Sequence, residues 1–470
     1  MPAGYSDVLI GLQYGDEGKA KVIDLLASDY DIVARFNGGA NAGHTIADAR
    51  GTLALHQIPS AVFHPSLLLY IGSGCVVSLE KLAKEIAAVQ AFGIDLSGRL
   101  SISSQASVIQ PHHVVIDEAT GKELGTTKNG IGPAYADRAY RMEGKRQLNI
   151  RLCDLLEDPK HCFDAMKRST LDTIDRMDVS AIDPIETITR MEEALKTLTP
   201  FIERDTLFLQ KRVQKGARVL FEGAQSAMLD VVKGTVPYVT SSSTLAGAAY
   251  TGGDLSPSFH RKTIGVAKAI MSRVGNGPFA SEFGGEKSEA YCMEDDGNAH
   301  TRDYEQKTYD TEAFLASEDP FEMGVALRLL GGEYGTTTGR PRRMGMLDLV
   351  QLSYACSMSG VDVLFLTKCD LLSDFERTAA NAIPLVTGYT LDEQDIDFVP
   401  GSSDTYRRVR CTVTLAPAFK ENISSVRSWG DLPLALQQVL RTIERKTGTK
   451  MLGIGVGPRS DQFVLKKMKE

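Results

Sequence analysis

The sequence predicts an α/β protein with a large, mainly parallel central sheet, helices on both faces and smaller peripheral subdomains. Short continuous apolar runs, such as 8–11 and 363–366, alternate with longer amphipathic segments. This alternation is typical of parallel strands that are covered on both faces. No repeat, low-complexity tract or linker interrupts the chain, so we expect one domain over residues 1–470.

The individual elements follow from local patterns. Strands are expected at 8–11, 32–36, 68–71, 218–221 and 363–366. A helix should follow the glycine-rich turn after the first strand, and another should run from Leu79 to Phe92 and end at Gly93. The last helix should open near Asp431, with Pro433 in its first turn, and close at Gly448. One face of that helix carries Leu436, Val439, Leu440 and Ile443.

Composition excludes several classes of protein. The formal charge is −8, with 52 basic and 60 acidic residues, which argues against a dedicated nucleic-acid binder. No apolar run approaches the roughly 20 residues that span a bilayer. The first residues lack the basic region and the apolar region that a secretory signal contains. The seven cysteines are scattered without a Cys-x-x-Cys pair, so we expect neither a zinc ribbon nor a disulfide framework, and a cytoplasmic location.

In parallel sheets, ligands bind beyond the carboxyl ends of the strands, so the segments after the strands matter most. After the first strand, the segment 13–21 contains Gly15, Gly18, Lys19 and Lys21 before a helix. It predicts either a polyphosphate loop or a glycine turn capped by acids, and it lacks the Gly-Lys-Ser/Thr of a Walker A motif. After the second strand, the small-residue loop 37–45 contains His44, a candidate general acid or phosphate donor.

Three further segments are rich in donors. Lys368 and Asp370 follow the run 363–366; a carboxylate there can accept from the ring N–H and exocyclic amine of guanine, which would favour GTP over ATP. The loop 125–133 joins hydroxyls, amides and a cation, as a phosphomonoester site would. The loop 335–343 places three threonines before three arginines, whose forks bind carboxylates and phosphates.

These segments together resemble the adenylosuccinate synthetase family from about Val8 to Pro458. The matching stretches are 15–19, 41–45, 125–127, 130–135, 221–225, 236–242, 273–279, 337–340 and 367–370. The resemblance implies a fold like that of P-loop NTPases without a Walker A motif. It also implies GTP-dependent ligation of L-aspartate to IMP through a 6-phosphoryl intermediate, giving adenylosuccinate, GDP and phosphate.

The resemblance implies roles for individual residues. Asp16 would be the general base and His44 would assist phosphoryl transfer, with Mg²⁺ on Asp16 and Gly43. GTP would contact Gly15, Glu17, Gly18, Lys19, Ala20, Lys21, Gly43, His44, Thr45, Arg342, Lys368, Cys369, Asp370, Gly455, Val456 and Gly457. IMP and aspartate would contact Asn41, Thr127, Arg141, Gln225, Leu229, Thr240, Val274, Thr337, Thr338 and Arg340. Arg141 matches an arginine that this family contributes from a neighbouring subunit, which implies a homodimer.

The chain also departs from the family pattern. Ala20 replaces a usual glycine, which requires a negative φ there. Segment 142–147 looks inserted beside Arg141. Residues 286–333 are much longer than the usual link, and the favoured interpretation is a surface flap. Two alternatives remain open: the same chemistry on GMP or dGMP, and a catalytically silent GTP-binding paralogue.

Overall fold

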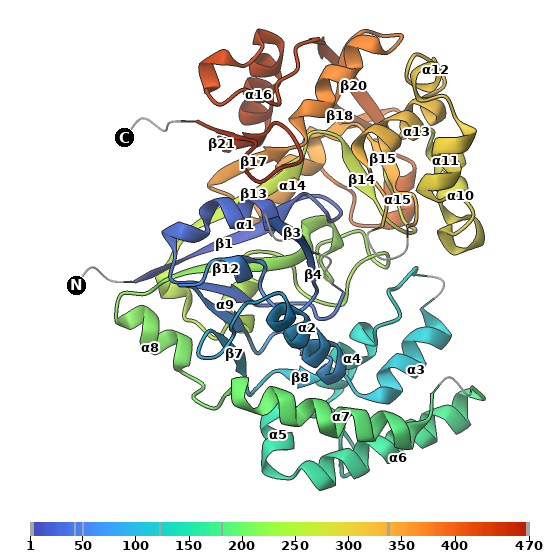
Figure 1. Ribbon diagram of the computed structural model, residues 1–470. Helices are drawn as coiled ribbons and strands as arrows, with labels where there is room; N and C mark the ends of the chain where they lie inside the picture. Colours follow the sequence, from blue (N-terminus) through green and yellow to red (C-terminus); the bar gives the residue numbers. More distant parts are fainter. Residues whose placement is uncertain are drawn as a thin grey trace. The chain divides into compact units, whose positions relative to one another are not determined.

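The computed structural model describes residues 4–41, 44–48, 51–121, 124–179, 182–335 and 339–466, with the main chain only at 44–48, 52 and 296. Its main sheet has ten strands and is mainly parallel, which confirms the predicted fold class. The chain folds as two compact units, each assembled from separate stretches of sequence (Figure 1). The first unit comprises 1–9, 23–225 and 240–261, and the second comprises 10–22, 226–239 and 262–470. The prediction of a single domain stays a prediction.

The first unit contains a run of parallel strands in the order β11-β7-β5-β2-β12. Its strands are β2 (Ile32–Arg35), β3 (His44–Asp48), β4 (Gly51–Leu55), β5 (Leu68–Ile71), β6 (Val76–Val77), β7 (Leu100–Ser103), β8 (Ser107–Val108), β9 (Met142–Glu143), β10 (Arg146–Gln147), β11 (Ile202–Glu203) and β12 (Arg218–Ser226). Val33 and Leu220, which are register partners on β2 and β12, are both fully buried. The apolar runs of the sequence therefore lie in the core, as expected for strands covered on both faces.

Helices surround these strands. They are α2 (Leu79–Ala91), α3 (Pro111–Thr120), α4 (Ile131–Tyr140), α5 (Leu152–Glu157), α6 (Pro159–Met177), α7 (Pro184–Leu198), α8 (Phe208–Gln214) and α9 (Ala248–Gly252). Helix α3 packs on α4 and α6, and α7 packs on α2 and α6 (Figure 1). Strand β1 (Tyr5–Gly11) and helix α1 (Lys19–Leu26) run across the division between the units.

The second unit contains β13-β17-β21-β22, parallel except for β22. A smaller sheet joins β16, β18, β19 and β20. The strands are β13 (His260–Lys268), β14 (Met271–Arg273), β15 (Arg343–Gly345), β16 (Leu347–Asp348), β17 (Val363–Thr367), β18 (Ala382–Leu391), β19 (Gln394–Ile396), β20 (Arg410–Pro417), β21 (Lys450–Gly455) and β22 (Phe463–Leu465). The helices are α10 (Gly285–Met293), α11 (Arg302–Thr308), α12 (Thr311–Leu315), α13 (Pro320–Gly331), α14 (Leu349–Ser359), α15 (Ser403–Arg407) and α16 (Leu434–Thr447).

Two predicted boundaries need correction. The strand expected to stop at Phe221 continues to Ser226 as β12, because the buried Glu222 carboxylate accepts from the amide and hydroxyl of Ser60 and so satisfies its charge inside the sheet. The last helix begins at Leu434 rather than near Asp431, and Pro433 is its N-cap. Its predicted apolar face is buried, and Gly448 ends it with φ of 69°.

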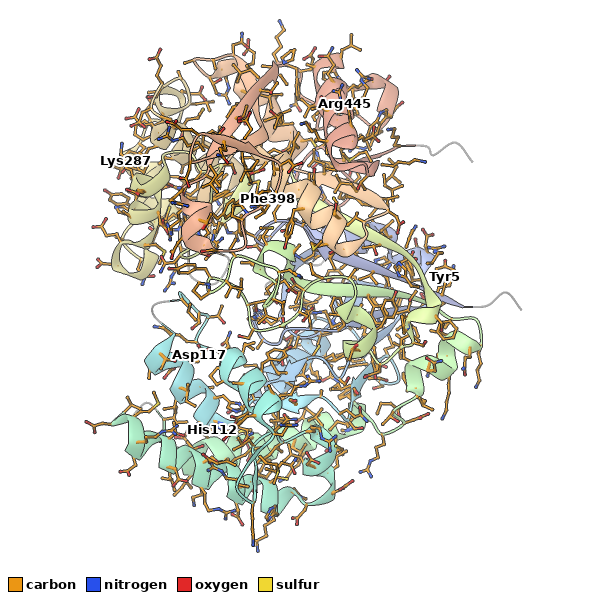
Figure 2. The ribbon with its side chains drawn as sticks, turned by 180° about the vertical axis from the view of Figure 1, so that it is seen from behind. Tyr5, His112, Asp117, Lys287, Phe398 and Arg445 are labelled. Atoms are coloured by element: carbon orange, nitrogen blue, oxygen red, sulfur yellow. The ribbon has the colours of Figure 1, made fainter. Side chains whose placement is uncertain are left out.

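Segment 286–333 is more than the surface flap that its sequence suggested. It forms helices α10 to α13, and Phe321, Val325, Leu329 and Tyr334 make a buried cluster there. Side-chain caps begin three of the helices: Thr301, Asp310 and Asp319 accept from main-chain amides of α11, α12 and α13. Figure 2 labels Lys287 on α10 of this segment. Among the described residues, no helix has both the length and the apolar stretch that crossing a bilayer requires.

Candidate active site

The segment between β1 and α1 forms a tight loop lined with main-chain amides. Gly15, Asp16 and Gly18 have φ of 96°, 57° and 84°. Left-handed residues this close together can turn main-chain amide groups toward a common point, and such concavities bind anions. Ala20 lies inside α1 and is not among the residues with positive φ, so its methyl group fits without strain.

The Glu17 carboxylate braces this loop from inside. One of its oxygens accepts from the amides of Gln13, at 3.1 Å, and Gly15, at 2.9 Å. The other accepts from Lys19 Nζ, at 2.9 Å, and from the Ser226 hydroxyl, at 2.7 Å. Burial alone would raise the pKa of Glu17, but Lys19 and the Ser226 hydroxyl bring that pKa below its usual value. The loop is therefore shaped before any ligand arrives.

Asp16 lies at the mouth of this loop and contacts an arginine from the predicted 335–343 loop. Arg342 Nη2 is 2.6 Å from Asp16 Oδ2, and Arg342 Nη1 is 2.9 Å from Glu333 Oε2. Glu333 also pairs with Lys268, at 3.1 Å, and with Lys368. Burial would raise the pKa of Glu333, but the three cations hold it well below its usual range. One buried carboxylate thus organises three cations beside Asp16.

The predicted guanine residues gather at the ends of β17 and β21. A Cβ on Gly455 would lie 3.6 Å from the Lys368 amide nitrogen. Lys21 donates to the Gly457 carbonyl at 2.5 Å, and burial lowers the pKa of Lys21 to about 8. Burial raises the pKa of Asp370 despite the nearby Lys21 and Lys368. The structure thus brings the cations and the carboxylate of this predicted subsite together.

Four of the predicted GTP residues turn their side chains inward. Glu17, Cys369 and Val456 are fully buried, and Ala20 is 8% exposed. Cys369 Sγ lies 3.4 Å from the Leu366 carbonyl. These residues can therefore reach a ligand only through their main chains.

In the first unit, the structure brings Asn41 and Gln225 together. Asn41 Oδ1 accepts from the Gly39 amide at 3.1 Å. A Cβ on Gly38 would lie 3.1 Å from Gln225 Oε1 and 3.4 Å from Asn41 Oδ1. Gln225 has φ of 56°, and within the described part of the chain its buried Oε1 accepts no hydrogen bond. A buried acceptor without a donor costs free energy, and a bound ligand that supplies a donor would remove this cost.

The loop before α4 contacts the same region. Asn129 Nδ2 donates to the Ala40 carbonyl at 3.3 Å and to the Thr127 hydroxyl at 3.1 Å. A Cβ on Gly132 would lie 3.1 Å from the hydroxyl of Ser241, which follows the predicted Thr240. Asn41, Thr127 and Thr240 thus come from three neighbouring loops, and Gln225 from the end of β12.

Arg141 occupies a separate, exposed position. It caps the C-terminus of α4 with φ of 69°, and its amide donates to the Asp137 carbonyl at 2.8 Å. The adjacent segment 142–147 is the two-stranded hairpin of β9 and β10. The side chain is exposed, as a contribution to a partner subunit would require.

The remaining predicted residues are placed as follows. A Cβ on Gly15 would lie 3.9 Å from Leu229 Cδ1, so Leu229 adjoins the phosphate-type loop. Val274 is 44% exposed. Gly43, Thr337 and Thr338 lie outside the described residues, and for His44 and Thr45 only the main chain on β3 is described.

Sequence reasoning missed Glu333 and Lys268. Glu333 lies inside the segment interpreted as an insertion, although an acid three positions before a Thr-Thr-Thr run and three arginines is a usable signal. Lys268 ends β13, and its Nζ is fully buried between Ser272 and Glu333. Only the strand order could indicate that pairing.

A second cluster of potential metal ligands lies on α3 and α4. His112 Nε2 and His113 Nε2 are 3.1 and 3.0 Å from Asp137 Oδ2. His113 Nδ1 accepts from the Gln110 amide, which places the ring proton on Nε2. An Nε2 that carries a proton cannot ligate a metal, so the cluster fastens α4 to α3. Figure 2 labels His112 there.

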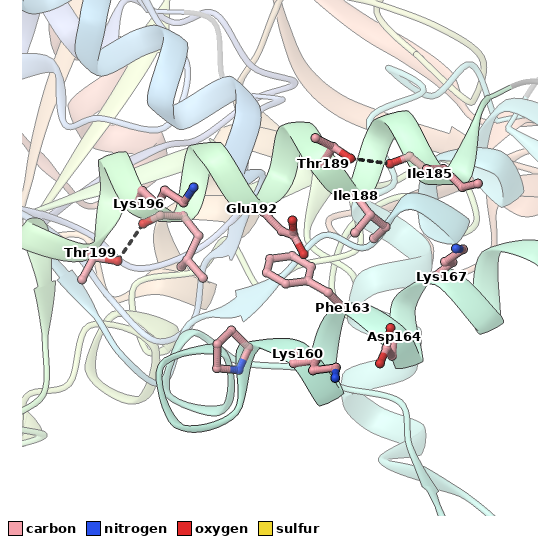
Figure 3. A pocket seen from close by; sticks show the side chains of 12 residues that line it. Lys160, Phe163, Asp164, Lys167, Ile185, Ile188, Thr189, Glu192, Lys196 and Thr199 are labelled. Atoms are coloured by element: carbon pink, nitrogen blue, oxygen red, sulfur yellow. Dashed lines mark hydrogen bonds between the residues drawn. The ribbon is translucent and has the colours of Figure 1, made fainter.

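A groove of about 530 Å³ lies between α6 and α7, and none of the predicted site residues lines it (Figure 3). Its walls combine apolar and charged side chains: Pro159, Lys160, Phe163, Asp164, Lys167, Ile185, Ile188, Thr189, Glu192, Leu195, Lys196 and Thr199.

A mainly parallel sheet, an amide-lined loop after its first strand and cations gathered at the strand ends define a nucleotide-binding α/β enzyme. The adenylosuccinate synthetase family model matches residues 8–464. The chain belongs to the adenylosuccinate synthetase family, whose members are GTP-dependent ligases of purine biosynthesis. The predicted family and enzyme class are thereby confirmed.

Relatives support this assignment. Adenylosuccinate synthetase 2 of Cupriavidus pinatubonensis is 48% identical over 464 residues, which cover 99% of this chain and 98% of the relative. The fully ligated adenylosuccinate synthetase of Plasmodium falciparum has a TM-score of 0.83 and 30% identity, covering 99% of this chain and all of that chain. A cyanophage S-2L succinoaminodeoxyadenylate synthetase bound to dGMP and dATP has a TM-score of 0.58 and 18% identity over 98% of this chain and 95% of that one, a likeness of fold alone.

Proposed function

We propose that this chain joins L-aspartate to IMP with GTP as the energy donor, through a 6-phosphoryl intermediate. The purine 6-oxygen attacks the γ-phosphorus, the bond to the β-phosphate oxygen breaks and GDP leaves. The aspartate amine then attacks C6 and phosphate departs. Phosphorylation is chemically necessary because an amide-like oxygen is a poor leaving group and phosphate is a good one.

The observation that carries this proposal is the position of Asp16. Its carboxylate lies at an amide-lined loop and contacts Arg342 at 2.6 Å. In the proposed reaction Asp16 takes the N1 proton of the purine, which makes the 6-oxygen nucleophilic. Arg342 then lies where charge develops on the transferred phosphoryl group. His44 serves the same step, as the family resemblance implies.

Mg²⁺ fits the donor set. Asp16 has 43% of its side chain exposed and offers hard carboxylate oxygens, which Mg²⁺ prefers. Asp16 and the Gly43 carbonyl would hold the ion, which when bound neutralises phosphate charge. Arg342 contacts Asp16 Oδ2, so the guanidinium and the ion would share this carboxylate.

GTP would occupy the loop 15–21 with its phosphates and the Lys368–Asp370 region with its base. The Asp370 carboxylate accepts the paired N–H donors of guanine, which adenine lacks. Lys21 and Arg342 supply positive charge for the phosphates, and Gly455 to Gly457 offer main-chain atoms beside the base. Selectivity for GTP over ATP follows from this assignment.

IMP would be held by the first unit's loops. Asn41, Thr127, Gln225 and Thr240 would receive the monophosphate, with Arg141 from the partner subunit of a homodimer. Gln225 Oε1, which has no donor among the described residues, supports a polar ligand at this point. Leu229 and Val274 would flank the nucleotide. Thr337, Thr338 and Arg340 would contact aspartate.

A direct assay tests the reaction. Purified protein with IMP, GTP, Mg²⁺ and L-aspartate should release phosphate and form a succinylated nucleotide detectable by mass spectrometry. Asp16→Asn should abolish turnover while GTP still binds within a few-fold. Asp24→Asn, which removes a carboxylate on the following helix α1 that pairs with His64, is the matched control and should stay active. Near-normal turnover of Asp16→Asn would reject the base assignment.

The acceptor is tested separately. As the family resemblance implies, related phage enzymes that use dGMP often lack the equivalent of Asp16, so its presence here favours IMP. With IMP and dGMP supplied together, we expect only the IMP product, and a dominant dGMP product would move the chain to the other acceptor class. Tight GTP binding without any aspartate-dependent phosphate release would identify a silent paralogue. The reaction is proposed to take place in the cytoplasm.

A further inference from the structure

The helical segment 286–333 surrounds a buried ion pair. Arg328 on α13 pairs with Glu305 on α11: Nε lies 3.0 Å from one carboxylate oxygen, and Nη2 lies 2.5 Å from the other. Arg328 is 1% exposed and Glu305 is fully buried. The Tyr334 hydroxyl also donates to Glu305. A two-pronged buried pair of this kind fixes both side chains in one orientation.

The remaining nitrogen of Arg328 leaves the segment and reaches the active-site loop. Arg328 Nη1 donates to the main-chain carbonyl of Arg342 at 2.9 Å. The Arg342 amide donates to the Glu333 carbonyl at 3.0 Å. The main chain of Arg342 is therefore held on both sides by residues of the segment, while its side chain bridges Asp16 and Glu333.

The segment contacts the same loop at a second point. A Cβ on Gly297 would lie 3.0 Å from the Cγ and Cδ atoms of Arg340, so the turn after α10 supports the stem of this arginine. Tyr334 forms an isolated β-bridge with Pro341, and its ring belongs to the apolar cluster of α13. Arg340, Pro341 and Arg342 thus rest against one packed surface.

We propose that the helical segment 286–333 is a positioning element for the catalytic loop. Glu305 orients Arg328, Arg328 fixes the Arg342 carbonyl, and Arg340 and Arg342 are thereby held in place before substrates bind. This inference rests on the proposed function, in which Arg340 contacts aspartate and Arg342 contacts the transferred phosphoryl group. It identifies Glu305 and Arg328 as positioning residues that touch no substrate.

The test separates the ion pair from the loop contact. Arg328→Lys keeps a charge that can pair with Glu305 but cannot also reach the Arg342 carbonyl. Glu305→Gln keeps the shape and removes the charge. In both variants we expect the KM for L-aspartate to rise at least fivefold, because Arg340 is less well held, and the KM for GTP to rise as well, because Arg342 is released from its position at the phosphates. Glu312→Gln, which removes the exposed pair with Arg377 in the same segment, should change neither constant.

A second measurement does not depend on turnover. Hydrogen exchange of the peptide covering 339–346, followed by mass spectrometry, should be at least tenfold faster in Glu305→Gln and Arg328→Lys than in the unmodified chain and in Glu312→Gln. If Glu305→Gln fails to fold, Tyr334→Phe removes only the phenol donor and should show a smaller change in the same direction. Unchanged exchange, or faster exchange with an unchanged KM for aspartate, would overturn the positioning role.

The two proposals fail in different ways. If the unmodified chain makes no succinylated nucleotide, the proposed function fails, while the exchange measurement still reports whether the segment holds the loop. If the unmodified chain is active and the variants match it in both measurements, the positioning role alone fails.

Discussion

Glu333→Gln is the most demanding test of the charge arrangement beside Asp16. Glu333 is 1% exposed and accepts from the Ser272 hydroxyl, at 2.7 Å, as well as from the cations. Two of those cations, Lys268 and Arg342, are buried, whereas Lys368 has 32% of its side chain exposed. The substitution keeps the volume, removes the charge and turns an amide N–H₂ group toward a cation.

The magnitude follows from this burial. Removing one partner of a buried ion pair costs about 3 to 5 kcal/mol, because the other charge remains desolvated and uncompensated. Lys368 can turn toward water, so its lost pair adds less than about 1 kcal/mol. We therefore expect Glu333→Gln to lower the unfolding free energy of the second unit by about 3 to 5 kcal/mol. Lys268→Met should cost less, because Glu333 would keep Arg342 and Lys368.

The assay is urea unfolding followed by the fluorescence of Trp429, the single tryptophan of the chain, which lies in the second unit. With an m-value of about 3 kcal/mol/M, the expected shift of the midpoint is about 1 to 2 M. Glu312→Gln is the matched control, since its carboxylate is 66% exposed and should change the midpoint little. A loss below about 1 kcal/mol for Glu333→Gln would refute the view that this carboxylate balances the buried cations.

Three other outcomes are expected. GTP binding should take up a proton near pH 8 and weaken as the pH rises further, because burial lowers the pKa of Lys21 to about 8 and a bound triphosphate would restore its charge. Calorimetry in buffers of different ionisation enthalpy measures this proton uptake, and Lys21→Met should abolish it. Arg141→Leu should raise the KM for IMP more than tenfold with the KM for GTP within twofold, and equal rises would contradict a role at the monophosphate. The free energy of unfolding should fall as the pH drops from 6.5 to 4. Burial lowers the pKa of His113 from 6.5 to about 4, so the unfolded chain binds the proton first, and the loss should reach up to about 3 kcal/mol. In His113→Gln the urea midpoint should vary less over this pH range.

Local patterns predicted most strands and the motif-bearing loops correctly. The strand at 363–366 and the helix from Leu79 are found where expected. A continuous apolar run is buried on both faces as a strand, and an apolar stripe at helical spacing is buried on one face of a helix. Gly448 ends the last helix because glycine adopts a positive φ without strain. Such signals lie within a few residues of one another, so they can be interpreted without knowledge of the fold.

The candidate site was only partly predictable. The glycine loop and the Lys368–Asp370 pair carry local signatures, but the inward orientation of Glu17 depends on Ser226, which is distant in sequence. The link from Glu305 to Arg342 through Arg328 likewise depends on how α11 and α13 pack.

Sequence alone therefore determined the family and the parallel α/β architecture, and it predicted the phosphate and guanine loops, because each depends on residue types at short spacings. Tertiary structure alone decided which charges meet. Glu333 joins Lys268, Lys368 and Arg342 across separations of 65, 35 and 9 residues. Electrostatic energy depends on distance in space and on burial, and neither can be deduced from the order of residues along the chain.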